Sequence, residues 1–145
     1  AQQPVTIGTM NGTNITFYAP LVDVLCSHPY ARDRAGLEQL IAGYCVMMTE
    51  EKKPMLVNEC VPGSDNDEVR GETHRYYLEQ LSAAGLGCMP WSIREGRHVA
   101  ARRDRMDGNG IDNKGYHPTF NANGTLRAGH EWMRQKPALR APWEK

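Results

Sequence analysis

The sequence predicts an α/β fold built on parallel strands. Two observations indicate this class: four short runs are almost continuously apolar, and two longer stretches between them carry helical spacing. The predicted strands cover residues 5–10, 21–26, 55–59 and 86–91. Short, uniformly apolar runs are typical of parallel strands, and their alternation with helices indicates parallel crossover connections.

The stretch between the second and third predicted strands indicates an amphipathic helix. Its apolar residues fall at i, i+3, i+4, i+7, i+8 and i+11, so they form a stripe along one face of a helix. The stripe consists of Leu37, Leu40, Ile41, Tyr44, Cys45 and Met48. We therefore expect this face to pack on the sheet.

A second helix is predicted between the third and fourth strands. Asp65 and Glu68 have the spacing of a capping pair at its start, and Gly85 stands where a left-handed residue closes a helix. The predicted helix carries the apolar and aromatic residues Val69, Tyr76, Tyr77 and Leu81.

Two segments depart from this alternation. The connection after residue 10 is too short for a crossover helix, so residues 15–20 are expected to form a helical turn or an extended arm. Gly, Asn and Asp dominate residues 104–115, which predicts a long loop. Within that loop, residues 107–112 lack the ligand spacing of a calcium site. A short helix is expected around residues 126–135.

The charge and hydropathy of the chain weigh against two classes of partner. Seventeen basic and seventeen acidic residues give a net charge of +0. A nucleic-acid partner is not expected, because binding a phosphate backbone takes a clustered cationic excess. A membrane partner is not expected either, because the mean hydropathy is −0.60 and no long uncharged apolar run occurs.

The cysteines do not indicate a metal centre. Cys26, Cys45, Cys60 and Cys88 form no Cys-x-x-Cys pair, so we expect no metal site and no cofactor. Each cysteine lies in or beside an apolar segment, where a free thiol acts as a small hydrophobic group. We expect all four to be reduced and buried.

Polar and aromatic side chains follow three of the predicted strands, at the end of a parallel sheet where ligands bind. They are His28, Tyr30, Asn58, Glu59, Trp91 and Arg94. A lone histidine or tryptophan in such a place is more typical of a structural residue. Glu59 differs, because an ionised carboxylate that closes an apolar strand is costly to bury unpaired. This position therefore favours a functional role for Glu59.

These motifs resemble the last strands of a retaining glycoside hydrolase barrel of the cellulase and β-mannanase type. In that family the sixth strand ends in a His-x-Tyr pair, the seventh in the nucleophilic glutamate and the eighth in an aromatic sugar platform. The matching residues here are His28-Pro29-Tyr30, Glu59 and Trp91. Residues 5–10 are similar to the fifth strand, and the resemblance spans about residues 4–132.

The resemblance implies that Glu59 is catalytic, that Trp91 is a sugar platform and that the ligand is a β-linked polysaccharide or oligosaccharide. As a carbohydrate-binding site, the same residues would divide the work differently. Tyr30 and Trp91 would stack on sugar faces, and the expected hydrogen-bonding partners of the sugar hydroxyls are His28, Asn58 and Arg94.

The chain is too short for a complete barrel, which runs to about 250 residues. It is similar to the carboxyl-terminal half, a parallel (βα)4 half of a TIM barrel, and residues 1–145 are expected to form this single half-barrel domain. The family's general acid/base, which ends the fourth strand, has no match. Glu95, Asp23 and Asp33 are the candidate carboxyl groups that remain, and none stands at the family's acid position. We expect the chain alone to be weakly active or inactive.

A half-barrel with helices on one side leaves one sheet face and two strand edges uncovered, and such surfaces associate. We therefore expect a homodimer that closes through the open face and the strand edges. A two-fold axis along the barrel would place both Glu59 side chains on one rim. A two-fold axis perpendicular to the barrel would place them at opposite ends, and the sequence leaves both geometries open.

Two other functions remain compatible with these residues. The first is a non-catalytic carbohydrate-binding module, and the second is a purely structural half-barrel that self-associates. The particular polysaccharide is not indicated. The compartment is also open, although the resemblance favours an extracellular location.

Overall fold

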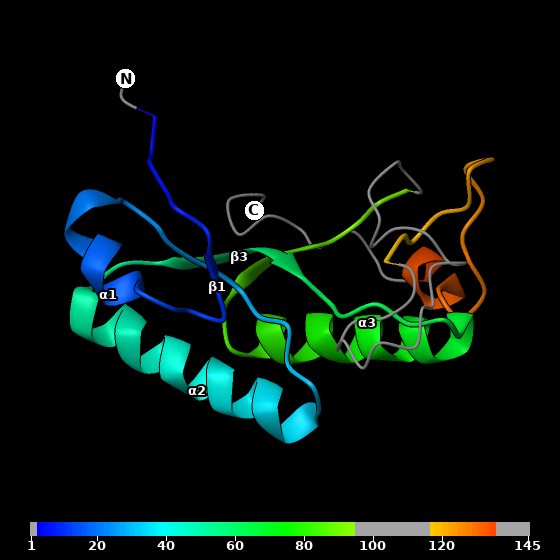
Figure 1. Cartoon of the computed structure of the whole chain (residues 1–145), viewed down its shortest axis with the longest axis horizontal. Helices are drawn as coiled ribbons and strands as arrows, with labels where there is room; N and C mark the ends of the chain where they lie inside the picture. The colour runs from blue at the N-terminus through cyan, green and yellow to red at the C-terminus, as the bar shows by residue number, and fades with distance from the viewer. Residues whose placement is uncertain (1–2, 95–116, 136–145) are drawn as a thin grey trace, which may run out of the picture.

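A computed structural model of the chain describes residues 3–94 and 117–135. The strands form a four-stranded sheet in the order β1-β2-β3-β4, and every neighbouring pair is parallel (Figure 1). In chain order the elements are β1 (Thr9–Met10), α1 (Ile15–Tyr18), the 3-10 turn η1 (Ala19–Leu21), β2 (Leu25–His28), α2 (Arg34–Glu51), β3 (Met55–Cys60), α3 (Asp67–Ala83), β4 (Gly87–Pro90) and the 3-10 turn η3 (Glu131–Arg134). The predicted parallel α/β half-barrel is confirmed.

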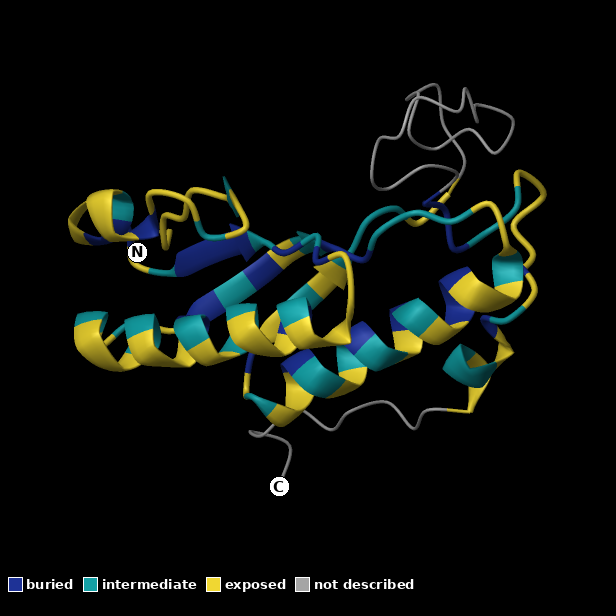
Figure 2. Cartoon of the chain, turned by 60° about the horizontal axis from the view of Figure 1, so that its bottom comes forward, coloured by how far each residue is buried: buried dark blue, intermediate teal, exposed yellow. Residues whose placement is uncertain are grey.

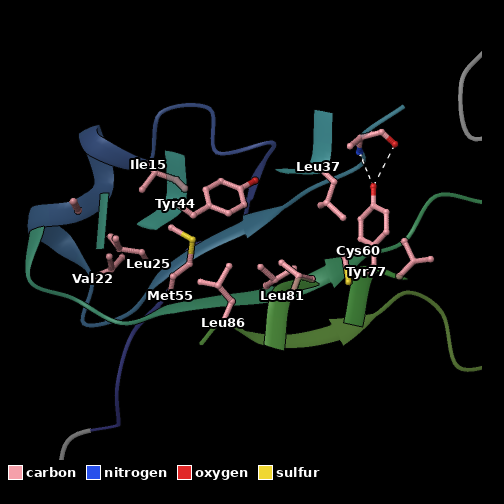
Figure 3. Packing of buried hydrophobic residues seen from close by; sticks show 14 residues of the cluster. Ile15, Val22, Leu25, Leu37, Tyr44, Met55, Cys60, Tyr77, Leu81 and Leu86 are labelled. Carbon is pink, nitrogen blue, oxygen red and sulfur yellow. Dashed lines mark hydrogen bonds between the residues drawn. The ribbon is translucent and has the colours of Figure 1, made fainter. Parts of the chain in front are cut away.

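The two long helices, α2 and α3, lie on the same face of the sheet (Figure 1). Their outer faces are exposed (Figure 2), and part of each inner face packs on the strands. Leu37 and Tyr44 of α2 and Tyr77 and Leu81 of α3 enter a core that also includes Val57 of β3. Figure 3 shows this packing between the helices and the strands. The core therefore lies between the sheet and the helices, outside the curve that a closed barrel would enclose.

Helix α2 follows the predicted stripe with one correction. Asp33 caps its first turn by accepting a hydrogen bond from the Gly36 backbone N–H at 2.7 Å. Leu37 and Tyr44 are buried, but Cys45 is exposed, so the expectation that all four thiols are buried was wrong. Each residue of a helix turns by 100°, and with Tyr44 aimed at the core, Cys45 is carried to the rim of the stripe.

Helix α3 begins with a different cap from the predicted one. The side chain of Asn66, not the pair Asp65 and Glu68, accepts the hydrogen bond from the Val69 backbone N–H, at 3.0 Å. The prediction of a left-handed Gly85 after the helix is confirmed, because its φ is +73°. Val69 is exposed, since the inward positions of the first turns belong to the neighbouring Arg70 and Gly71.

The first two strands differ from their predicted bounds. Residues 5–8 run beside the segment before β2, where the Val5 carbonyl accepts hydrogen bonds from the backbone of residues 23 and 24, but only Thr9–Met10 forms strand pairs. Strand β2 begins at Leu25, not at residue 21, because Ala19–Leu21 is a 3-10 turn. The Lys53 ammonium donates a hydrogen bond to the Ala19 carbonyl oxygen of this turn. Of the two alternatives for residues 15–20, a helical turn or an extended arm, the structure shows the helical turn.

The other face of the sheet and both of its edges lack a covering helix within the described residues. On that face, Cys26, Leu56 and Gly87 share one row of the strand register. The edge strands β1 and β4 expose Met10 and Met89, with 53% and 55% of their surface accessible. This uncovered face is the one that a complete barrel would turn inward.

A C-terminal segment, residues 117–135, packs against α3 and the end of β4. Buried Arg127 donates to the Asp67 carboxylate at 3.1 Å, which ties this segment to the first turn of α3. A helix was expected over residues 126–135, but the structure shows only the short turn η3. The predicted loop over residues 104–115 lies outside the described residues. None of the described helices has the length and apolarity needed to cross a membrane.

Candidate active site

A β-bulge places Glu59 at the carboxyl end of β3. Along β3 the register advances three residues, from Val57 to Cys60, while β4 advances two, from Cys88 to Pro90. The extra residue lets Val57 and Cys60 both point into the core while Asn58 and Glu59 between them stay partly exposed. Bulges re-aim side chains at strand ends. Here the bulge directs two consecutive polar side chains away from the core.

The Glu59 carboxylate contacts two side chains from the end of β2. The Tyr30 hydroxyl donates to its Oε1 at 2.7 Å, and His28 Nδ1 lies 3.8 Å from its Oε2. The side chain of Glu59 is 33% exposed and that of His28 is 21% exposed. The carboxylate is therefore held by two side chains while it remains partly accessible to solvent.

The Tyr30 phenol keeps its proton in this arrangement. Burial, and next the hydrogen bond to Glu59, raise the pKa of Tyr30 far above its ordinary value of 10. Its backbone N–H donates to the Asn11 side chain at 2.9 Å, which fixes the loop after β2. Tyr30 is thus a hydrogen-bond donor to the carboxylate throughout the physiological pH range.

Asn58 belongs to the part of the site on the sheet face that a complete barrel would turn inward. Its Oδ1 accepts a hydrogen bond from the Cys26 thiol at 2.9 Å, which orients the side-chain amide. Gly8 closes the same corner, because a Cβ atom there would lie 2.3 Å from His28 Nε2 and 3.3 Å from Asn58 Oδ1. The backbone of residue 8 therefore comes as close to the histidine ring as a residue without a side chain allows.

Trp91 follows β4 and is half-buried beside a ring that the sequence did not indicate. The imidazole of His117 lies 4.7 Å from the Trp91 ring and 6.3 Å from the Tyr30 ring, centroid to centroid. Buried Arg70 donates to the carbonyl oxygens of Trp91 and His117 at 3.1 and 2.8 Å. The peptide bond between Trp91 and Ser92 is cis.

Arg94 follows β4, three residues after Trp91. It is exposed, and its backbone bridges to Phe120. The five remaining predicted residues, His28, Tyr30, Asn58, Glu59 and Trp91, all lie at the carboxyl ends of β2, β3 and β4.

Two of the candidate acid groups, Asp23 and Asp33, are engaged by other groups of the chain. The Asp23 carboxylate accepts from the Val5 backbone N–H at 2.8 Å, at the amino end of β2 and thus at the opposite end of the sheet. Asp33 caps α2, and Glu95 lies outside the described residues. Within residues 3–94 and 117–135, then, neither Asp23 nor Asp33 stands as a second carboxylate beside Glu59.

The site around Glu59 lies at the open edge formed by the carboxyl ends of β2, β3 and β4. A cavity of about 430 Å³ lies between the first turns of α2 and α3, and its lining includes Arg34, Glu72 and Tyr76. It includes none of the predicted sugar-binding residues, so the site of Glu59 is distinct from it. Among the described residues, no three His, Cys, Asp or Glu side chains gather in a way that could hold a metal ion.

Three residues of the site were missed by sequence reasoning. Gly8 carried a usable signal, because a lone glycine inside a strand pattern often marks a close backbone approach. Arg70 and His117 carried none: Arg70 is a charged residue within a helix, and His117 is separated from Trp91 by residues 95–116, whose sequence has no helix or strand spacing.

Comparison with solved structures supports the architecture. The chain superimposes on one of two fungal β-1,4-galactanases with a TM-score of 0.62 at 12% identity, covering 93% of this chain and 48% of the galactanase. It superimposes on a β-glycosidase with a TM-score of 0.53 at 13% identity, covering 98% of this chain and 43% of the other. An endo-1,4-β-D-mannanase from Thermotoga petrophila matches at 20% identity and a TM-score of 0.46. No protein-family model and no curated protein sequence matches the chain.

These comparisons define the class of the fold. The chain spans a little under half the length of the galactanase and of the β-glycosidase. It therefore has the architecture of part of a TIM barrel like those of the galactanase and the β-glycosidase. At 12% and 13% identity, the likeness establishes the fold alone.

Proposed function

We propose that this chain is the nucleophile-bearing half of a retaining β-glycosidase barrel that acts on β-linked polysaccharide. The observation that carries the proposal is the geometry of Glu59. Its carboxylate ends an inner strand of the sheet, accepts from Tyr30 at 2.7 Å, lies 3.8 Å from His28 and remains 33% exposed. The fold shared with a galactanase and a β-glycosidase is consistent with this role.

In the proposed reaction, Glu59 attacks the anomeric carbon of the sugar. The bond between that carbon and the leaving oxygen breaks, a glycosyl ester forms on Glu59, and the leaving oxygen needs a proton. Tyr30 holds Oε1, which leaves Oε2 as the attacking oxygen. Trp91 is the proposed stacking platform, and His28, Asn58 and Arg94 are the proposed hydrogen-bonding groups.

The reaction requires a second carboxyl group about 5–5.5 Å from the nucleophile, held protonated to serve as the general acid. Since Asp23 and Asp33 are engaged elsewhere, we propose that the acid comes from a second half-barrel that covers the open face. The proposed partner is a second copy of this chain, because two half-barrels together can complete one barrel. Exposed Met10 and Met89 at the two sheet edges support such pairing.

The proposed pairing predicts the mass of the particle in solution. We expect light scattering to give a mass near twice 16.3 kDa, because pairing buries apolar edges that water would otherwise solvate. The double variant Met10→Asp, Met89→Asp should shift the mass to that of one chain, and the matched surface variant Val46→Asp on α2 should not. A parent protein that stays monomeric at high concentration would contradict the homodimer.

A non-catalytic carbohydrate-binding role is the second candidate. The observation that favours it is that Asp23 and Asp33 are engaged by other groups and so do not serve Glu59 as an acid. The half-buried Trp91 ring lies at the same end of the sheet as Glu59. Such a module would bind sugars without cleaving them.

Glu59→Gln separates the two functions. We use dinitrophenyl β-glycosides of glucose, mannose and galactose, because their leaving group departs without protonation and the missing acid is bypassed. The parent should release about one equivalent of dinitrophenolate per chain in a burst as Glu59 is glycosylated. Glu59→Gln should show no burst but still bind β-linked oligosaccharides in calorimetry.

The other results are equally informative. Binding without a burst in the parent would overturn the catalytic proposal in favour of the binding module. Neither a burst nor binding in the parent would leave only the structural half-barrel. Glu51→Gln, at the end of α2, is the matched control and should behave as the parent.

A further inference from the structure

We infer that His117 is a positioning residue, which orients both the sugar platform, Trp91, and the nucleophile, Glu59. This inference rests on the function proposed above. His117 is buried and belongs to the C-terminal segment. Its imidazole touches the rings of both Trp91 and Tyr30. It therefore connects the end of β4 with the loop after β2.

The two ring contacts have defined geometry. The imidazole meets the Tyr30 ring nearly perpendicularly, at an interplanar angle of 86°, and meets the Trp91 ring at 57°. Edge-to-face contacts of this kind favour particular ring orientations. Since the Tyr30 hydroxyl donates to Glu59, a change at His117 reaches the carboxylate through Tyr30 and the stacking face through Trp91.

His117 is itself held from several directions. Arg70 donates to its carbonyl at 2.8 Å, the Ser92 backbone N–H donates to the same oxygen at 3.2 Å, and the ring Nδ1 lies 3.4 Å from the Val61 carbonyl. A carbonyl only accepts, so a hydrogen bond to Val61 requires the proton on Nδ1.

The Val61 backbone is unusual in a way that fits this role. Val61 follows β3 two residues after Glu59 and adopts a φ of +77°. A β-branched residue rarely occupies the left-handed region, and such conformations cluster at functional sites. Here the turn presents the Val61 carbonyl to the His117 ring, which joins the end of the nucleophile strand to the positioning residue.

A buried guanidinium is costly unless its donors are used. Arg70 donates hydrogen bonds to the carbonyl oxygens of Trp91 and His117. It therefore holds the segment that carries the platform and the segment that carries the imidazole next to each other. Displacements of about 1 Å in such positioning groups can cost up to about a hundredfold in rate.

A purely structural role for His117 would predict a different pattern of effects. His130 is the matched control, because it is as deeply buried and belongs to the same C-terminal segment. Its ring packs against His74 of α3, with the centroids 5.4 Å apart, and not against Trp91 or Tyr30. If His117 only filled space, replacing either histidine would have similar consequences at the site.

The experiment compares His117→Leu, His117→Phe and His130→Leu with the parent in two measurements. The first is the indole N–H resonance of Trp91 in a proton–nitrogen spectrum, assigned with Trp91→Phe. The second is the second-order rate constant of the dinitrophenolate burst. Leucine fills the space without a ring, while phenylalanine keeps the ring.

We expect His117→Leu to shift the Trp91 resonance and to lower the burst rate constant by about tenfold or more. His117→Phe should restore the rate to within about threefold of the parent, since it keeps both ring contacts. His130→Leu should lower the thermal stability but leave the Trp91 resonance and the burst rate unchanged at temperatures where it is folded.

The inference would be overturned if His117→Leu left the Trp91 resonance in place, or if His130→Leu reduced the burst as much as His117→Leu does. A parent without a burst would overturn the proposed glycosidase but not this test, because the Trp91 resonance still reports the position of the indole. A parent burst that His117→Leu does not slow would overturn the positioning role and leave the glycosidase standing.

Discussion

Replacing Gly71 by alanine should destabilise this protein by about 3 kcal/mol or release the C-terminal segment from α3. A Cβ atom at position 71 would lie 2.0 Å from the Gly129 carbonyl oxygen and 2.4 Å from its carbon. Both are backbone atoms, which cannot rotate away as a side chain can. Denaturant titration followed by circular dichroism measures the loss in the free energy of unfolding.

Gly43 provides a matched control in the other long helix. A Cβ atom at position 43 meets nothing within 4 Å, so Gly43→Ala should stabilise the protein by about 0.5–1 kcal/mol through better helix propensity. If Gly71→Ala were as stable as Gly43→Ala, the close packing of residues 117–135 on α3 would be wrong. Released residues would also carry His117 away from Trp91, and the site would lose its platform.

The second large effect is a loss of stability in acid that depends on His74. Burial, with the nearby Arg70 and His130, lowers the pKa of His74 to about 3. The pKa of His130 is also lowered, mainly by burial. In the unfolded chain both histidines titrate near 6.5. Below pH 6.5 the unfolded state therefore binds protons that the folded state does not.

The sign of the effect follows from this difference. Stability due to neutral His74 is fully present above pH 6.5 and declines as the pH falls toward about 3. The slope for one such histidine is about 1.4 kcal/mol per pH unit. His74→Phe keeps a ring against His130 and Trp132 but cannot take up a proton. As the pH falls from 7 to 4.5, the unfolding free energy of the parent should therefore decrease more than that of His74→Phe.

Carboxylates titrate in both proteins, so the comparison with His74→Phe removes their contribution. A difference between parent and His74→Phe that stays constant from pH 7.5 to 4.5 would contradict the buried, neutral state of His74.

The alternation of strands and helices was predictable because each element repeats a simple spacing. Leu37 and Tyr44, seven residues apart, lie along one line of α2, and the apolar run of β3 continues from Met55 to Val57. These patterns follow directly from burial on one helix face or within a parallel sheet. The carboxyl ends of the strands then place His28 and Glu59 at the same edge.

Helix α3 shows where hydropathy fails. Its buried stripe is Arg70, His74, Tyr77 and Leu81, spaced i, i+4, i+7 and i+11. Half of that stripe is polar, because Arg70 and His74 face the C-terminal segment, not the sheet. An apolar pattern cannot indicate a polar face that another segment covers.

The details of the site depended on geometry that no spacing encodes. The bulge that turns Asn58 and Glu59 away from the core appears only in the pairing of β3 with β4. The contact of His117 with Trp91 joins residues 26 positions apart in the sequence, across a segment with no periodic pattern. Tertiary contacts of this kind have no local signature.

The most direct test of the account is the identity of the side chain that a sugar modifies. Treating the protein with a 2-deoxy-2-fluoro β-glycosyl fluoride should trap the glycosyl ester, because the fluorine at carbon 2 slows its hydrolysis more than its formation when the leaving group is good. Peptide mass spectrometry should then find one added fluorosugar on the peptide that contains Glu59, and none in Glu59→Gln. A fluorosugar attached to any other residue, or no adduct with the glucose, mannose and galactose reagents, would contradict the assignment of Glu59 as the attacking group.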